Sequence, residues 1–321
     1  MARPISERLR ERARSVRSQL RRYPRAIAEA LREPPTDPSA SPPDTSDLLP
    51  SSADRLASAW LGHATALLRF GNTTVLTDPV FSRRIGPRVV GRTVGPARLQ
   101  DAPLHAGALR GVDIILLSHA HFDHLDLPSL ETLADARTTV ITAKGTRNLL
   151  PQGFRRVIEL PWNRTFRVGG VDITALEADH WGARHALDRW RRHNAYLVDA
   201  THSRVLFAGD TAATDAFDNL KNVDLAMLGI GAYEGWRHRH ATPEEAWEMF
   251  RRMRAAAMMA THHATFDMGE SSPDEPMQRL LRAAGEHERH VVCRETGDPW
   301  IPEIPDPASD PDAKPRPDGE A

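Results

Sequence analysis

The chain has 321 residues, and its 42 Lys and Arg against 43 Asp and Glu give a formal net charge of −1 at pH 7. This balance lacks the excess of basic side chains that neutralises phosphates, so no nucleic-acid partner is expected. A single cysteine, Cys293, excludes an internal disulfide and is compatible with a reducing compartment. No apolar run approaches the roughly 18 residues of a membrane helix, and the N-terminus lacks the apolar core of a secretion signal. The sequence therefore predicts a cytoplasmic protein.

Residues 1–33 are rich in arginine and show helical periodicity. Apolar residues recur at steps of three and four, at Ile5, Leu9, Val16, Leu20, Ile27 and Leu31. Pro24 should kink or split such a helix. A basic amphipathic helix can lie on an anionic membrane, which would make this segment a peripheral contact at the inner membrane surface. The alternative is a solvated helix that packs on the rest of the chain.

Two segments are predicted to lack fixed structure. Residues 34–54 are rich in Pro, Ser, Asp and Thr and are expected to form a linker. Residues 302–321 are a second tail rich in Pro and Asp. One catalytic domain is expected between them, at 55–301.

Within that domain, short apolar runs alternate with a few helical patterns. Strands are expected at 57–61, 66–70, 73–77, 113–117, 138–142, 156–160, 171–176, 195–199, 205–208, 223–228 and 257–260. Helices are expected at 129–136, 243–255 and 276–284. The second helix is well marked, because Thr242 can cap it, Pro243 suits its first position and Glu245 completes a capping box. This order of elements favours a layered α/β domain.

The most informative motif is His119-Ala120-His121-Phe122-Asp123-His124, which follows the apolar run 112–118. In an extended segment alternate side chains share one side, so His119, His121 and Asp123 project together. A turn after Asp123 could bring His124 beside them. Imidazole and carboxylate suit zinc and similar divalent ions, so the motif predicts part of two adjacent metal sites. A polar loop with solvated histidines is the alternative, and the matching partners downstream argue against it.

Further candidate ligands follow three other predicted strands. His180 comes after 171–178, Asp210 after 205–208, and His262 and His263 after 257–260. Each lies where a strand passes into a loop, the edge at which α/β folds gather their chemistry.

This set of residues resembles the metallo-β-lactamase superfamily, whose fold is a four-layer αββα sandwich with a binuclear site at one edge. The resemblance implies seven ligands: His119, His121 and His180 for a first ion, Asp123, His124 and His262 for a second, and Asp210 as the bridge. His263 replaces His262 if the register of the last strand differs by one residue.

Flanking segments narrow the resemblance to one branch of the superfamily. The segments 60–65, 76–81, 178–181, 207–211 and 229–234 occur in the order of the branch that holds N-acylphosphatidylethanolamine-hydrolysing phospholipase D and its bacterial relatives. The likeness covers roughly residues 57–300. It implies a phosphodiesterase of phospholipase D type acting on a phospholipid-like substrate. The branch is also similar to L-ascorbate-6-phosphate lactonases, which leaves a lactonase for a phosphorylated sugar acid as the alternative. A non-hydrolytic metal-binding or sensor module is the alternative from another class.

Two divalent ions about 3.5–4 Å apart can share a water and lower its pKa to near neutrality. Hydrolysis by a hydroxide held in a binuclear site is thus the leading interpretation, with Zn²⁺ as the expected metal and Mn²⁺ or Fe as the other candidates. The expected catalytic residues are Asp210, Asp123 and His240. Residues expected to orient ligands or contact substrate are His63, Asp78, Trp181, Tyr233 and Glu234. Asp78 as a turn-capping carboxylate, His240 as an exposed histidine and Trp181 as a packed core residue remain open.

Overall fold

The computed structural model describes residues 48–49, 56–89, 92–185, 187–268 and 272–302. The expected basic segment 1–33, the tail from residue 303 and nearly all of the linker 34–54 lie outside the described residues. Of that linker, Leu48 and Leu49 are described. Leu49 is fully buried in the apolar cluster on the outer face of the first sheet.

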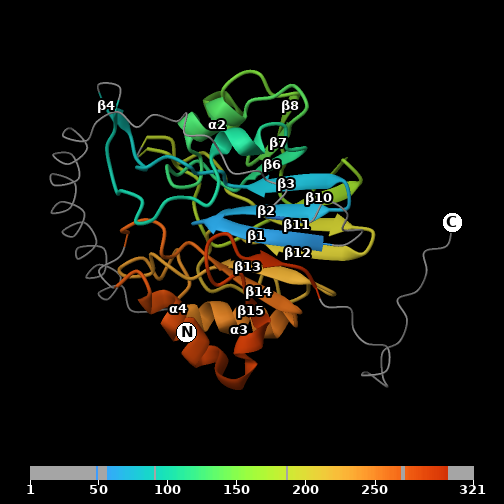
Figure 1. Cartoon of the computed structure of the whole chain (residues 1–321), viewed down its shortest axis with the longest axis vertical. Coiled ribbons are helices and arrows are strands. Elements are labelled where there is room, and N and C mark those ends of the chain that lie inside the picture. Colours follow the sequence, from blue (N-terminus) through green and yellow to red (C-terminus); the bar gives the residue numbers. More distant parts are fainter. Residues whose placement is uncertain (1–47, 50–55, 90–91, 186, 269–271, 303–321) are drawn as a thin grey trace.

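The described residues form two seven-stranded sheets that face one another (Figure 1). The first sheet has the order β16 (Pro299–Trp300), β1 (Leu56–Gly62), β2 (Thr65–Phe70), β3 (Thr73–Thr77), β6 (Ile114–Leu117), β7 (Thr139–Thr142) and β8 (Arg156–Glu159). The second has the order β15 (Val291–Val292), β14 (Ala257–Thr261), β13 (Leu225–Gly229), β12 (Ser203–Phe207), β11 (Ala195–Ala200), β10 (Val171–Leu176) and β9 (Thr165–Val168). A small hairpin of β4 (Arg88–Val89) and β5 (Arg92–Thr93) stands apart.

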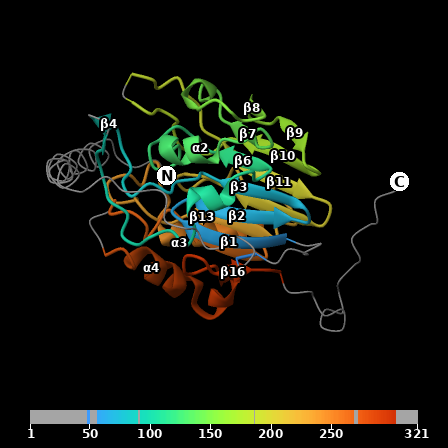
Figure 2. The same ribbon diagram turned by 45° about the horizontal axis from the view of Figure 1, so that its top comes forward.

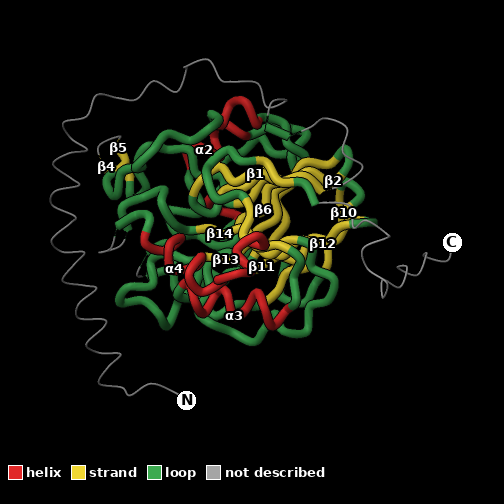
Figure 3. Tube along the Cα trace, turned by 60° about the horizontal axis from the view of Figure 1, so that its bottom comes forward, coloured by secondary structure: helices red, strands yellow, loops and turns green. Residues whose placement is uncertain are grey.

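Helices cover the outer faces of both sheets (Figures 2 and 3). The cluster between the second sheet and its helices includes residues of α3 (Pro243–Met253) and α4 (Glu275–Ala284). On the first sheet, α2 (Leu127–Leu133) and the 3₁₀ turn η2 (Ala106–Leu109) contribute to the outer cluster. Two further 3₁₀ segments are η3 (Arg147–Leu149) and η4 (Gly285–His290).

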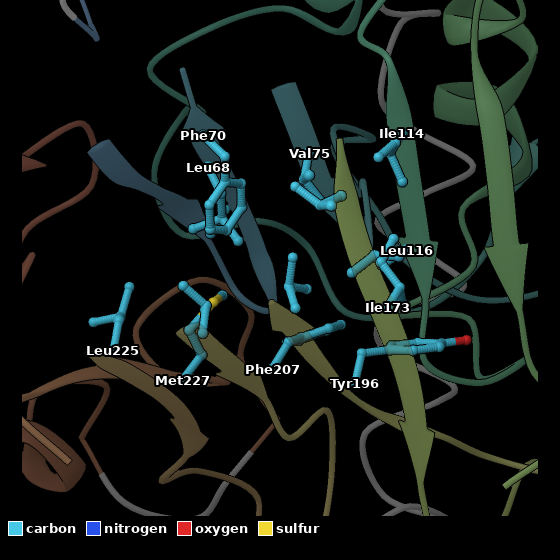
Figure 4. Packing of buried hydrophobic residues seen from close by; sticks show 14 of the residues in the cluster. Leu68, Phe70, Val75, Ile114, Leu116, Ile173, Tyr196, Phe207, Leu225 and Met227 are labelled. Carbon is cyan, nitrogen blue, oxygen red and sulfur yellow. The ribbon is translucent and has the colours of Figure 1, made fainter. Parts of the chain in front are cut away.

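The largest apolar cluster lies between the two sheets (Figure 4). Leu68 and Ile114 of the first sheet face Tyr196 and Phe207 of the second, and all four are almost completely buried. Both faces of the central strands are therefore covered, which explains why β6 is a continuous apolar run and why every residue of β1 is buried. The expected four-layer αββα sandwich is confirmed.

All eleven expected strands are present, with small differences at their ends. The hairpin, β9, β15 and β16 were not predicted. The last two have only two residues each, too few for a periodic signal. The first helix runs over Leu127–Leu133 rather than 129–136, because the backbone of Ala134, with ψ +116°, has already left the helical conformation. The expected capping box of Thr242 and Glu245 is confirmed.

The connections place every candidate ligand at one edge of the sandwich. In the first sheet β3, β6, β7 and β8 are parallel, and in the second β12, β13, β14 and β15 are parallel. Loops that leave the carboxyl ends of parallel strands meet at the same edge. No helix in the described part of the chain is both long and apolar enough to cross a membrane.

Candidate metal centre

The His119–His124 motif forms a tight turn at the end of β6. The backbone N–H groups of His124 and Leu125 donate to the carbonyl of His121, at 3.2 and 2.9 Å. The expected turn therefore exists and brings His124 beside the extended part of the motif.

One group of potential ligands contains His119, His121, His180 and Asp210, with ligating atoms all within 4.8 Å of one another. His119 Nε2 lies 2.8 Å from His121 Nδ1, and His180 Nε2 lies 3.4 Å from the same atom. Asp210 Oδ2 lies 3.7 Å from His119 Nε2 and 3.6 Å from His180 Nε2. Three imidazoles and one carboxylate thus converge on one point.

A second group contains His63, Asp123, His124 and His262. Asp123 Oδ2 lies 3.1 Å from His63 Nε2, 3.3 Å from His262 Nε2 and 3.6 Å from His124 Nε2. Asp210 lies between the two groups, since its Oδ2 is also 3.1 Å from His124 Nε2 and 3.3 Å from His262 Nε2. The residues expected to bind two ions are therefore brought together, with Asp210 at the position of a shared ligand.

A chain of hydrogen bonds fixes which nitrogen of each imidazole faces the centre. His119 Nδ1 donates to Ser118 Oγ at 2.8 Å, and Ser118 Oγ donates to Asp78 Oδ2 at 2.5 Å. His124 Nδ1 donates to the same Asp78 oxygen at 2.6 Å, and His180 Nδ1 donates to the carbonyl of Arg239 at 3.0 Å. With Nδ1 protonated, Nε2 of each ring keeps a lone pair directed at the centre, as metal-binding histidines require. Sequence reasoning proposed Asp78 for this role and missed Ser118, although Ser118 directly precedes the motif.

The donor set fits divalent cations. His124 Nε2, His262 Nε2 and Asp210 Oδ2 are buried at the centre and close to one another, but none of them makes a hydrogen bond of regular geometry within the described residues. Such orphaned polar atoms are costly unless an ion or a ligand satisfies them. The donors are only nitrogen and oxygen, which suits zinc, manganese or iron.

The carboxylates of Asp123 and Asp210 also favour a positive charge between them. Burial alone lowers the pKa of His262, but the carboxylates of Asp210 and Asp123 outweigh it and raise that pKa to about 9. The pKa of His124 rises against burial for the same reason. In the metal-free molecule these two imidazoles would hold protons where a bound cation would supply the charge instead.

His63 lies closer to the centre than its expected orienting role required. Its Nε2 is in reach of Asp123, and burial, with His262 nearby, lowers its pKa to about 3, so the ring is neutral near pH 7. The turn between β1 and β2 holds it there: Gly62 has φ +107° and His63 φ +53°. Trp60 Nε1 and the backbone N–H of His262 both donate to the carbonyl of His63. His63 therefore orients Asp123 or joins the ligands.

The structure separates the two candidate histidines after β14. His262 points its Nε2 at both carboxylates, whereas His263 stacks on Trp60 with ring centroids 4.6 Å apart and belongs to no candidate metal group within the described residues.

We expect His262→Ala to lower metal content and abolish turnover, because it would remove a candidate ligand. His263→Ala should retain metal and most activity while lowering the free energy of unfolding by about 2–4 kcal/mol, the cost of a cavity under a buried ring. Metal analysis and urea unfolding of the two variants compare these roles directly. The reverse pattern would identify His263 as the ligand.

Asp78→Asn tests the hydrogen-bond chain behind the site. Asp78 has φ +28°, a conformation that Asn tolerates, so the backbone should persist. Asn offers one acceptor oxygen where the carboxylate accepts from Ser118 N, Ser118 Oγ and His124 Nδ1. We expect metal affinity or activity to fall by about 10–100-fold, measured by zinc titration with a competing chelator. Unchanged affinity would show that His124 is oriented without it.

The other predicted residues lie around the centre at different distances. His240 Nδ1 is 3.9 Å from Asp210 Oδ2, and burial lowers the pKa of His240 to about 3. Trp181 contacts His121 edge-on at 4.6 Å and stacks on Trp236, so it forms one wall. Tyr233 and Glu234 line a cavity beside His262, but the Tyr233 hydroxyl donates to Glu275. A substrate role for these residues stays a prediction.

Comparison with known proteins places the chain in a family. The model of the β-lactamase superfamily domain matches residues 73–263, so the chain belongs to that superfamily. An uncharacterized protein of Mycobacterium tuberculosis is 34% identical over 72% of this chain and 65% of its own length. The mitochondrial N-acyl-phosphatidylethanolamine-hydrolyzing phospholipase D of Saccharomyces cerevisiae is 31% identical over 74% of this chain and 54% of its own length. The chain thus spans less than two thirds of these curated relatives.

Solved structures agree with the fold. The isothiocyanate hydrolase from Delia radicum gut bacteria aligns over 76% of this chain and 98% of its own, with a TM-score of 0.60 and 17% identity. At that identity the likeness shows the shared fold alone. The resemblance inferred from the motifs is confirmed at the level of the superfamily.

Proposed function

We propose that the protein is a metal-dependent hydrolase, a phosphodiesterase of phospholipase D type that cleaves a phospholipid-like substrate. The observation that carries the proposal is the convergence of buried imidazoles and two carboxylates on two adjacent points that share Asp210. The identity to the yeast phospholipase D supports the phosphodiester over other substrates.

In this proposal His119, His121 and His180 would hold one divalent ion, Asp123, His124 and His262 would hold a second, and Asp210 would serve both sites, with zinc as the expected metal. When bound, such a pair supplies hydroxide from water near neutral pH and neutralises charge on the phosphate oxygens. Asp210 has a pKa well below its usual range, because the surrounding imidazoles outweigh burial. It is therefore ionised at neutral pH and can orient the attacking water by accepting its proton in a hydrogen bond.

His240 is placed to serve the phosphate. Five imidazoles lie within 4 Å of Asp210. The side chain of His240 is 12% exposed, whereas those of His119, His124, His180 and His262 are at most 1% exposed. With a pKa of about 3 the ring is neutral, so it acts as a hydrogen-bond donor rather than as an imidazolium acid. Attack of water forms a new P–O bond and breaks the P–O bond to the alcohol, which leaves with a proton that the water gives up. A donor at the position of His240 stabilises charge on the phosphate oxygens.

The cavity beside His63 and His262 limits what can enter there. It holds about 50 Å³, with Phe266, Met268 and Pro276 among its walls. This space suits the polar end of a substrate with a short apolar neighbour. A lipid would present its phosphate to the centre.

A substrate panel tests the proposal. The zinc-loaded protein is expected to hydrolyse bis-p-nitrophenyl phosphate and to release phosphatidic acid species from N-acylphosphatidylethanolamine. Faster opening of a phosphorylated sugar lactone, with no diester cleavage, would establish the lactonase alternative. Metal binding without turnover of either class would favour a binding or sensor module and overturn the proposal.

A further inference from the structure

Arginine is concentrated in two segments of a chain that is otherwise electrically balanced. Residues 79–100 contain five arginines and no acidic residue, and residues 182–192 contain four arginines and one aspartate, Asp188. The whole chain has 42 basic and 43 acidic side chains. Two loops thus hold a marked local excess of positive charge.

The two segments lie side by side in space. The first contains the β4–β5 hairpin, and the second is the loop between β10 and β11. Both line a cavity of about 260 Å³, to which the hairpin contributes Arg88 and Thr93 and the loop contributes Arg184 and His185. Figures 1 and 2 show the hairpin beside this yellow-green loop.

The same two segments expose apolar side chains. Five large apolar residues are exposed in the described part of the chain, and four of them lie here: Val89 (49%), Leu99 (46%), Leu187 (96%) and Trp190 (61%). Single exposed apolar residues need no explanation, but their concentration on two neighbouring arginine-rich segments does.

Several of the arginines are available for a partner. Arg88 and Arg189 are exposed and make no ion pair with the described residues, whereas Arg191 is held by Asp188 at 2.6 Å. Arg84 and Arg98 are buried and belong to the scaffold. Arg184 donates to two backbone carbonyls of the motif loop, those of Ala120 and Leu125, which ties this surface to the candidate metal centre.

We propose that this surface, defined by Arg88, Val89, Leu187, Arg189 and Trp190 and called here the docking face, binds the surface of a bilayer that contains anionic phospholipids. The proposal rests on the proposed function, because a phospholipid substrate must be reached in a membrane. Arginines attract anionic headgroups, and exposed Val, Leu and Trp side chains can insert into the headgroup region.

A bilayer explains the combination better than a nucleic acid does. Nucleic-acid sites pair basic groups with several aromatic side chains on which bases stack, whereas Trp190 is the one aromatic residue of the docking face and Val89 and Leu187 are aliphatic. The cavity between the hairpin and the loop is also lined by Phe122, which lies between His121 and Asp123 in the motif. Docking through this face would therefore bring the edge with the metal ligands close to the membrane.

Vesicle flotation of the full chain tests the docking face. The protein is expected to float with vesicles of phosphatidylcholine and phosphatidylglycerol in a 7:3 ratio, and not with phosphatidylcholine alone. Each basic residue near an anionic surface contributes about 1 kcal/mol, or about fivefold in partitioning. Since Arg88→Glu with Arg189→Glu also adds two repelling charges, partitioning should fall by at least about 25-fold. Val89→Ser with Leu187→Ser should weaken binding to the vesicles. The binding that remains should be mainly electrostatic and therefore more sensitive to salt.

The matched control is Arg282→Glu with Arg289→Glu, which makes the same charge change at exposed positions of α4 and η4. It should float like the wild type. An equal loss of flotation in the control would show that the effect comes from net charge alone and would overturn the proposal. Unchanged flotation of the docking-face variant would also overturn it. If the wild-type protein binds neither kind of vesicle, the proposal is wrong and a protein partner becomes the expected occupant of the docking face. The docking-face variant should keep its activity on bis-p-nitrophenyl phosphate, which is soluble. Turnover of this diester therefore tests the hydrolase proposal, and flotation tests membrane docking independently of it.

Discussion

Asp210→Ala should lower the turnover of bis-p-nitrophenyl phosphate by at least about 10³-fold. Asp210 Oδ2 lies within 3.1–3.7 Å of four imidazole nitrogens, so its loss affects both candidate ion sites at once. His121→Ala should act on the first site alone. Turnover numbers, together with metal content by mass spectrometry, are the measurements.

The matched control is Asp215→Ala, an exposed carboxylate five residues further along the same loop. It should keep wild-type turnover and metal content. Circular dichroism should show that the Asp210 variant remains folded, since alanine removes a charge that the metal-free site compensates only with protonated imidazoles. A folded Asp210→Ala protein with full metal and near wild-type turnover would refute the assignment of Asp210.

The motif itself made much of the site predictable. Within a strand end and a tight turn, sequence spacing fixes which side chains share a side, so His119, His121, Asp123 and His124 could be grouped from the sequence. Positions after apolar runs made Asp210, His180, His262 and His263 candidates, and the resemblance to the superfamily chose Asp210, His180 and His262 among them. The strands were predictable for the same reason, because burial between two sheets leaves apolar runs at regular positions.

Other features depend on contacts that no local pattern records. The approach of His63 to Asp123 follows from a turn with two positive φ values and from hydrogen bonds to residues about 200 positions away. By contrast, β9 could have been predicted, because Gly169 and Gly170, both with positive φ, join it to β10 in the manner of a hairpin turn. The short β15 and β16 carry no such signal.

A second large effect is expected when the metal-free protein is acidified. Burial lowers the pKa of His63, His121 and His240 to about 3, 4 and 3, against 6.5 in the unfolded chain. At a pH between the folded and the unfolded pKa, the unfolded chain binds protons that the folded chain does not bind. The free energy of unfolding therefore falls as the pH falls below 6.5. At pH 5 each of these three histidines should lower the free energy of unfolding by about 2 kcal/mol. Together they should lower it by up to about 6 kcal/mol, compared with a typical total of about 5–15 kcal/mol.

His262 has the opposite effect, because its pKa rises to about 9 in the folded protein. Its protonation stabilises the folded protein fully below pH 6.5, and this stabilisation is lost as the pH rises through 9. Metal-free stability should therefore peak near neutral pH. Zinc at 100 times its dissociation constant should add about 2.7 kcal/mol at pH 7. This gain should shrink toward pH 5, because protons and metal compete for the same nitrogens. Urea unfolding at pH 7, 6 and 5, with and without zinc, measures both effects. A metal-free stability that stays level from pH 7 to pH 5 would show that these imidazoles are not buried in the neutral form.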